Sequence, residues 1–332
     1  MAKQLGIDIG TSSIKLIVND SGSIKKIGIV PNRFGKLITA MTNSERIQFT
    51  DEVKKAMSEL GIKETSVVAS LPESLTFSKF MKFPRMSTPE LATAIKWELD
   101  QTVPFPPNEI ESSWSVFDKN DVMADDLTGV FVVAVPSKVS ELYVQMFELL
   151  GLEPTRLENE TVPLARANAN LLSDSPTFLV DFGASGTKIV LASKSMIINN
   201  YYFSVGGIVM TKLIADNFGL TLDQAEQYKR IYGLQQDQLD GKIYKILKPI
   251  VDNFITEIRK MTLTYKNDFG DKPVNKMILT GGGCYLAGLI PYLTSTFEGI
   301  DISIGNVFDG VNVEPNYQQM GPIFSLSFGL TL

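Results

Sequence analysis

The sequence contains no histidine and one cysteine, Cys284, among its 332 residues. Without histidine the chain has no Ser-His or Cys-His nucleophile pair and no His-ligated zinc or iron site. One cysteine cannot form a disulfide within the chain, which favours a reducing compartment. The remaining polar groups are carboxylates, hydroxyls, lysines and backbone amides, which is the set that proteins use to hold nucleotide phosphates and magnesium.

Long apolar runs and an excess of positive charge are also missing. The longest apolar stretches, such as residues 130–135, are far shorter than the roughly 20 residues of a membrane-spanning helix. The first residues lead into strand-like sequence, without the basic and apolar regions of a signal peptide. The net charge is −6, whereas nucleic-acid binding relies on clustered Lys and Arg. We therefore expect a cytoplasmic protein that inserts into no membrane and binds no nucleic acid.

Two segments that lie half a chain apart share one design. Each has a short apolar strand with an Asp near its end, a turn of small residues, and a second apolar strand that carries a Lys. The segments span residues 5–18 and 178–191 and align without a gap. The aligned pairs are Asp8 with Asp181, Gly10 with Gly183, Ser12 with Ser185, and Lys15 with Lys188. This internal repeat predicts two similar β-hairpins.

An Asp at a strand end, followed by a glycine-bearing turn, suits phosphate binding. The glycines let backbone amides approach phosphate oxygens, and the carboxylate can hold the hydration shell of a magnesium ion. Two such hairpins that face each other across a cleft would clamp a triphosphate from both sides, with Asp8 and Asp181 binding magnesium through water. Glycine turns between strands are also common structural elements. A lysine on the outgoing strand can equally be an ordinary solvent-exposed residue, so we assign a phosphate-binding role to Lys15 and not to Lys188.

The segment between the hairpins has a different character. It predicts a helix over 90–99 with a start signal at 87–89, strands at 114–117 and 129–135, and a helix over 139–150. A proline-aromatic stretch at 103–107 ends the first helix, and an acidic loop at 118–126 joins the strands. We therefore expect a small α+β subdomain in which Trp97 packs in the core.

The remainder of the chain reads as α/β architecture. It predicts a strand over 201–207 that leads into Gly206-Gly207, helices over 208–218, 223–232 and 244–267, a strand over 276–280, and a helix from Tyr285. Gly281-Gly282-Gly283 lies between that strand and that helix and suits nucleotide binding at a helix N-terminus. No P-loop sequence is present. Residues 321–332 contain no Lys or Arg, which favours a buried terminal helix over a membrane-binding one.

The order hairpin, insertion, hairpin, Gly-Gly, helix and Gly-Gly-Gly resembles the actin-like superfamily, which includes actin, sugar kinases, FtsA and the heat-shock chaperones. The resemblance implies an α/β actin-like ATPase fold, with two duplicated βαβ-type lobes around a nucleotide cleft. It also implies a division of the chain. The first lobe would comprise 1–72 and 152–176, the inserted α+β subdomain 73–151, and the second lobe 177–332, with a smaller part at roughly 210–274.

The same resemblance implies ATP and magnesium as cofactors and names the binding residues. The first phosphate hairpin would contribute Asp8, Gly10, Thr11, Ser12, Ser13 and Lys15. The second would contribute Asp181, Gly183, Ser185, Gly186 and Thr187, followed by the turn Gly206 and Gly207. The adenosine would lie against Glu226, Lys229, Gly281, Gly282 and Gly283. Without the resemblance, Glu226 and Lys229 would be ordinary surface residues at helical spacing.

The inserted segment is similar to the PilM family, the cytoplasmic actin-like component of type IV pilus assembly. The matching residues are Trp97-Glu98, Val103-Pro104-Phe105-Pro106, Glu109 and the strand around Trp114. In that family a cleft beside the insertion accepts the N-terminal tail of the inner-membrane protein PilN. The resemblance implies an adapter that this tail recruits to the inner face of the cytoplasmic membrane. Further platform components and a second copy of the chain are additional candidate partners.

The sequence departs from related ATPases at one position. A Glu in a pattern like Glu-Pro-x-Ala orients the attacking water in those proteins, whereas here Val162 precedes Pro163 and Glu160 lies two residues upstream. A valine cannot orient water. We therefore expect ATP to be held firmly and hydrolysed slowly at most, with Glu160 as a candidate catalytic residue. A filament-forming scaffold of the FtsA type and a small-molecule kinase remain alternatives, although no motif for a substrate-facing general base is found.

Overall fold

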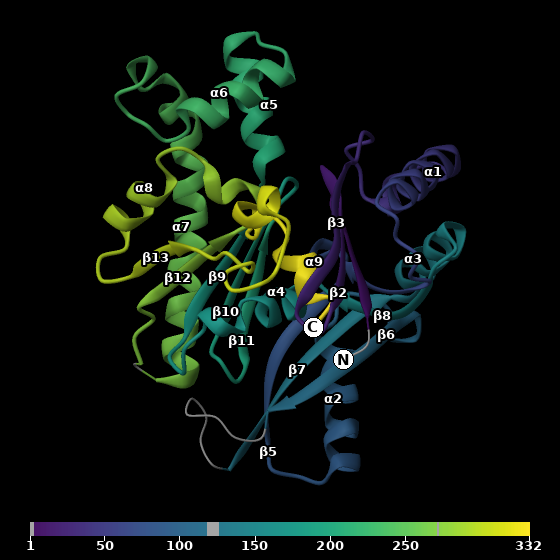
Figure 1. Ribbon diagram of the computed structural model, residues 1–332. Coiled ribbons are helices and arrows are strands. Elements are labelled where there is room, and N and C mark those ends of the chain that lie inside the picture. The colour runs from purple at the N-terminus through teal and green to yellow at the C-terminus, as the bar shows by residue number, and fades with distance from the viewer. Residues whose placement is uncertain (1–2, 118–125, 271) are drawn as a thin grey trace.

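The computed structural model of the chain describes residues 3–117, 126–270 and 272–332 (Figure 1). The predicted acidic loop at 118–126 therefore lies almost wholly outside the described residues. Two five-stranded sheets dominate the structure. The first has the strand order β3 (Ser23–Pro31), β2 (Ser13–Asp20), β1 (Gln4–Ile9), β4 (Ser66–Leu71) and β8 (Glu153–Asn159). The second has the order β11 (Ile197–Phe203), β10 (Thr187–Ala192), β9 (Thr177–Phe182), β12 (Lys276–Thr280) and β13 (Asp301–Ile304).

The two sheets share their strand directions as well as their order. In the first sheet, β1, β2 and β3 pair antiparallel, and β1 with β4 and β4 with β8 pair parallel. In the second sheet, β9, β10 and β11 pair antiparallel, and β9 with β12 and β12 with β13 pair parallel. Asp8 is the register partner of Lys15, and Asp181 is that of Lys188. The two turns close with equivalent backbone hydrogen bonds, Gly10 N–H to Ser13 O at 3.1 Å and Gly183 N–H to Gly186 O at 3.0 Å. The predicted repeat of two hairpins is therefore confirmed.

Helices cover both faces of each sheet. Outside the first sheet lie α1 (Asn43–Glu59) and α3 (Ser137–Leu150), whose apolar residues join those of β1, β2 and β4 in one core. Outside the second sheet lie α7 (Lys242–Phe269) and α8 (Leu289–Thr296). The helices α5 (Gly207–Phe218) and α6 (Leu222–Tyr232) lie above them, at the top of the view in Figure 1. Each α-helix therefore buries an apolar stripe against a sheet or a neighbouring helix, as amphipathic helices do.

Two short helices fill the space between the sheets (Figure 1). Leu164 of α4 (Thr161–Ala167) and Leu326 of α9 (Ser325–Gly329) pack against the inner face of the second sheet. Phe324, which directly precedes α9, and Phe328 within α9 pack against Ile17 of the first sheet. The predicted buried terminal helix is thus confirmed, and it contacts both halves of the chain. Among the described residues, no helix has the length and apolar character needed to cross a membrane.

The segment between β4 and β8 contains a third sheet, with the strand order β5 (Phe77–Pro84), β7 (Leu127–Pro136) and β6 (Ile110–Phe117). The helix α2 (Thr88–Thr102) packs on one face of this sheet. The Ser87 amide donates to the Glu90 carboxylate at 2.9 Å, which caps the start of α2. The helix ends before Pro104, because the residue preceding a proline disfavours helical backbone. We refer to β5, α2, β6 and β7 as the inserted sheet.

Two local predictions are wrong. Trp97 is 65% exposed instead of buried, because α2 turns Leu91, Ile95 and Leu99 toward the sheet and a residue two positions after Ile95 lies on the opposite face. No long helix starts at Tyr285. A 3₁₀ turn over Gly282–Tyr285 comes first, and α8 begins at Leu289 after Gly288 adopts a φ of +77°.

Candidate functional site

The two hairpins face each other across a cleft of about 720 Å³. That volume lies in the usual range for small-molecule sites. The cleft is lined by Glu160 and by every residue to which the sequence analysis assigned ATP binding. These residues come from both sheets, from α5 and α6, and from the turn after β12. The structure thus brings the predicted set together in one place.

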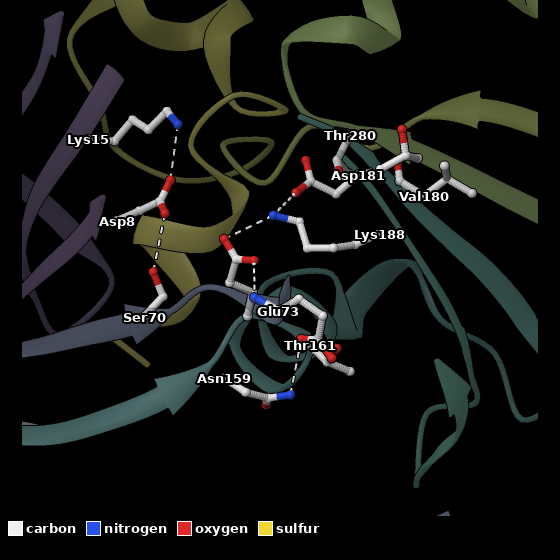
Figure 2. A network of polar contacts seen from close by, with 12 residues as sticks. Asp8, Lys15, Ser70, Glu73, Asn159, Thr161, Val180, Asp181, Lys188 and Thr280 are labelled. Atoms are coloured by element: carbon white, nitrogen blue, oxygen red, sulfur yellow. Dashed lines mark hydrogen bonds and ion pairs between the residues drawn. The ribbon is translucent and has the colours of Figure 1, made fainter. Parts of the chain in front are cut away.

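On the first side, Asp8 is buried at the end of β1, with 2% of its surface exposed. Lys15 Nζ donates to Asp8 Oδ2 at 3.0 Å, and Ser70 Oγ donates to Asp8 Oδ1 at 3.2 Å (Figure 2). Three adjacent strands therefore fix the carboxylate. Sequence reasoning missed Ser70, which lies inside an apolar strand and has no local motif around it.

On the second side, Lys188 holds two carboxylates. Its Nζ lies 2.8 Å from Asp181 Oδ2 (Figure 2). The same Nζ lies 3.0 Å from Glu160 Oε1. The alternative of a solvent-exposed lysine at position 188 is therefore wrong, because α4 packs against β10 and directs Glu160 toward Lys188. Burial alone would lower the pKa of Lys188, but the negative charges of Asp181 and Glu160 outweigh that effect and raise its pKa.

Behind Glu160 lies a second buried glutamate, Glu73. The Glu73 amide donates to Glu160 Oε2 at 2.8 Å, so both oxygens of Glu160 are engaged. Burial raises the pKa of both carboxyls, and the nearby Lys188 opposes that shift. Sequence reasoning missed Glu73, although a carboxylate directly after the strand 66–71 and Pro72 resembles the strand-end pattern of Asp8 and Asp181.

At the far end of the cleft, α6 presents Glu226 and Lys229 on one face. Lys229 Nζ donates to Glu226 Oε2 at 2.6 Å, to Thr211 Oγ1 at 2.9 Å and to Gly207 O at 3.0 Å. Burial raises the pKa of Glu226, but hydrogen bonds from Lys229 and Thr211, together with Arg230, lower it to about 2. Glu226 is therefore ionised at neutral pH. Its spacing of three residues from Lys229 places both side chains toward the cleft.

Glycines allow the turns to approach each other closely. Gly281 has a φ of +75°, and a side chain there would collide with the Asp181 carboxylate. A Cβ on Gly206 would lie 2.6 Å from Gly183 O, and the Gly207 amide donates to that same carbonyl at 3.0 Å. The Gly-Gly turn thus fixes the second hairpin against the start of α5.

The Thr11 hydroxyl is buried without a protein partner. Thr11 is 7% exposed and lines the cleft, and Oγ1 has no hydrogen bond to any part of the chain that the structure describes. A buried hydroxyl without a partner is destabilising, so the oxygen is available to a ligand. Within 3–117, 126–270 and 272–332, no cluster of three acidic or cysteine side chains could hold a metal ion by itself.

Comparison with known proteins identifies the family and the fold. The family model for type IV pilus assembly protein PilM matches residues 6–332. The chain superimposes on a PilM–PilN type IV pilus biogenesis complex with a TM-score of 0.84 and 24% identity, over 99% of this chain and 98% of the other. MreB5 of Spiroplasma citri bound to AMPPNP gives a TM-score of 0.58 at 12% identity, covering 99% and 95% of the two chains. These likenesses show the actin-like ATPase fold.

A curated relative shares a more limited region. Ethanolamine utilization protein EutJ of Escherichia coli K12 is 23% identical over 169 residues, which is 51% of this chain and 54% of EutJ. The chain therefore matches about half the length of that relative.

Replacement of Lys188 by Met tests the buried ion pairs. Lys188→Met leaves Asp181 and Glu160 buried without a cation, so we expect the free energy of unfolding to fall by about 3–5 kcal/mol. Urea unfolding measures the loss. Lys15→Met is the matched control, because Lys15 contacts one carboxylate and its side chain is 16% exposed. A loss no larger than that of the control would contradict the buried position of Lys188.

Proposed function

The chain belongs to the PilM family of type IV pilus assembly proteins and has the actin-like ATPase fold, and from that premise we propose that it is an ATP-binding adapter of the pilus assembly platform. The observation that carries the proposal is the pair of equivalent hairpins, which direct Asp8 and Asp181 toward one cleft. The nucleotide-bound state of MreB5, which has the same fold, supports it.

ATP would lie between the hairpins with its phosphates toward Asp8 and Asp181. The amides of the two turns and the Thr11 hydroxyl would donate to phosphate oxygens, and Lys15 would supply a positive charge. Asp8 and Asp181 would hold magnesium through water, and the metal would neutralise part of the triphosphate charge. Glu226, Lys229 and Gly281–Gly283 would contact the adenosine. The volume of the cleft and the free Thr11 hydroxyl support this assignment.

The nucleotide would serve to hold a conformation more than to drive a reaction. Val162 packs in the apolar cluster around Leu164 and Leu179, and both oxygens of Glu160 are bonded to other groups. In this arrangement neither Val162 nor Glu160 can orient an attacking water. ATP would therefore close the two lobes and remain bound, and the chain would be at most a slow ATPase.

The partner would be the N-terminal tail of a PilN-like inner-membrane protein. The PilM–PilN complex supports this partner, because the chain aligns with it over almost its full length. Such a tail binds a preformed groove by adding extended backbone or apolar anchors. The groove would lie beside the inserted sheet, and the tail would bring the chain to the inner face of the cytoplasmic membrane.

Replacement of Thr11 tests ligand binding separately from the stability of the fold. We expect Thr11→Val to lower the affinity for ATP and magnesium roughly tenfold, because a hydrogen bond to a charged phosphate contributes about 1.5 kcal/mol. The variant should keep the stability of the nucleotide-free chain, because the hydroxyl has no hydrogen-bond partner among the described residues to lose. Calorimetric titration and urea unfolding measure the two quantities.

Thr50→Val is the matched control for Thr11→Val. Thr50 is buried in α1, outside the cleft, and its hydroxyl donates to Ile47 O at 2.8 Å. The control should lose about 1 kcal/mol of stability and keep its ATP affinity. A Thr11→Val variant that loses stability but binds ATP normally would refute the assignment of this hydroxyl to a ligand.

Slow turnover is the kinetic consequence of the occupied Glu160. With saturating ATP and magnesium we expect steady-state phosphate release at least about a hundredfold below the ~10 per second that is typical of enzymes. A coupled phosphate assay on the full chain, with and without the partner's tail peptide, measures it. Turnover at the rate of a metabolic kinase in either condition would exclude a purely conformational role for ATP.

A further inference from the structure

We propose that Glu73 is a positioning residue that couples the phosphate end of the cleft to the inserted sheet. The inference rests on the proposed binding of ATP. Glu73 lies in the short turn that connects β4 of the first sheet to β5 of the inserted sheet, and 5% of its surface is exposed. It does not line the cleft, so it acts on the nucleotide site only through its neighbours.

The link toward the cleft runs through Glu160. One oxygen of Glu160 contacts Lys188 Nζ at 3.0 Å, and the other accepts a hydrogen bond from the Glu73 amide at 2.8 Å. A phosphate that approaches Lys188 competes with Glu160 for the same ammonium group. The contact between Glu160 and Lys188 would therefore be weaker in the ATP-bound chain than in the nucleotide-free chain. A ligand shifts a conformational equilibrium only through such a difference in contacts between the two states. Any displacement of Glu160 acts directly on the Glu73 backbone.

The Glu73 carboxylate extends the link to three other elements. Its Oε1 accepts from Ser78 Oγ of β5 at 2.6 Å and from Asn200 Nδ2 of β11 at 2.8 Å. Its Oε2 accepts from Asn159 Nδ2 at the end of β8 at 3.1 Å and from Thr161 Oγ1 of α4 at 2.9 Å. All four partners are donors. A carboxylate satisfies four donors at once, whereas a glutamine would turn its own N–H groups toward two of them.

The Asn200 amide also donates to Ser78 Oγ at 2.7 Å, which closes a ring of three residues from the turn, the inserted sheet and the second sheet. The strand β5 of the inserted sheet also contacts the C-terminal end of α7, which belongs to the second half of the chain. The Phe80 and Phe269 rings lie 5.7 Å apart, and Lys82 Nζ donates to Asp268 O at 2.8 Å. Because β5 is held to both halves, a change in their relative position must move the inserted sheet.

Tryptophan fluorescence can report a movement of the inserted sheet. Its two tryptophans, Trp97 on α2 and Trp114 on β6, both lie in the inserted sheet. Neither lines the cleft, so ATP does not contact them directly. A change in tryptophan emission on ATP binding therefore reports a change in the inserted sheet.

The experiment titrates ATP and magnesium into the full chain and records tryptophan emission, while calorimetry measures binding separately. The unaltered chain should show a saturable emission change with the calorimetric dissociation constant. We expect Glu73→Gln to bind ATP within about threefold of the unaltered chain but to lose most of the emission change. Glu73→Gln that binds ATP and keeps the full emission change would overturn the inference.

Matched variants separate coupling from general destabilisation. Glu158→Gln alters a half-buried glutamate of the first sheet, whose carboxylate accepts from Arg166 Nη2 at 2.7 Å, and this variant should keep the full emission change. If Glu73→Gln does not fold, Ser78→Ala removes the end of the link on β5 and should reduce the change. Its control is Ser140→Ala, because the Ser140 hydroxyl donates to Ser137 O within its own helix. Equal emission changes in Ser78→Ala and Ser140→Ala would overturn the inference.

Failure of the proposed function gives a different result from failure of the coupling. An unaltered chain that binds ATP without any emission change would refute the coupling and leave the proposed function in place. An unaltered chain that binds no ATP would refute the proposed function, and this inference with it. Joint loss of ATP binding and emission change in Glu73→Gln would show a role in building the site and would overturn the coupling role.

Discussion

The bridge that Lys188 makes between Asp181 and Glu160 joins the two halves of the chain at the floor of the cleft. Removal of the lysine would leave two buried carboxylates unpaired, which is far more costly than the bridge itself is favourable. Asp8, Glu160 and Asp181 line the floor of the cleft together with the ammonium groups of Lys15 and Lys188. Glu73 lies directly behind Glu160, outside the lining of the cleft.

The two halves share their strand order but diverge after the fourth strand of each sheet. In the second half, β12 leads into a glycine turn and α8, whereas in the first half β4 leads into Pro72 and Glu73, where the inserted sheet begins. The end of β4 therefore leads directly from the cleft into the inserted sheet. In the proposed function, the two hairpins would bind the nucleotide, and the inserted sheet, which the described residues of the second half do not duplicate, would respond to that binding.

Local patterns predicted the two hairpins, the glycine turns, and the elements α2, α3, α5, α6, α7, β6, β7 and β12, because each depends on residues close together in the chain. No prediction was made for β3, α1, β4, β5, β8 or β13. The burial of Lys188 could not be predicted in this way, since it depends on α4 packing against a strand of the other half. Ser70 and Thr211 were missed for the same reason. Trp97 is different. The spacing of Leu91, Ile95 and Leu99 alone places it on the outer face of its helix, so a stricter use of helical periodicity would have predicted its exposure.

In the proposed function, ATP would hold the chain in a shape that binds the tail of a membrane partner. The decisive measurement is calorimetric titration of a PilN-like N-terminal peptide into the full chain, with ATP and magnesium and again without nucleotide. We expect binding that is at least about tenfold tighter in the ATP-bound state, which corresponds to a coupling free energy of about 1.4 kcal/mol. Absence of peptide binding in both states, or equal affinity in the two, would contradict it.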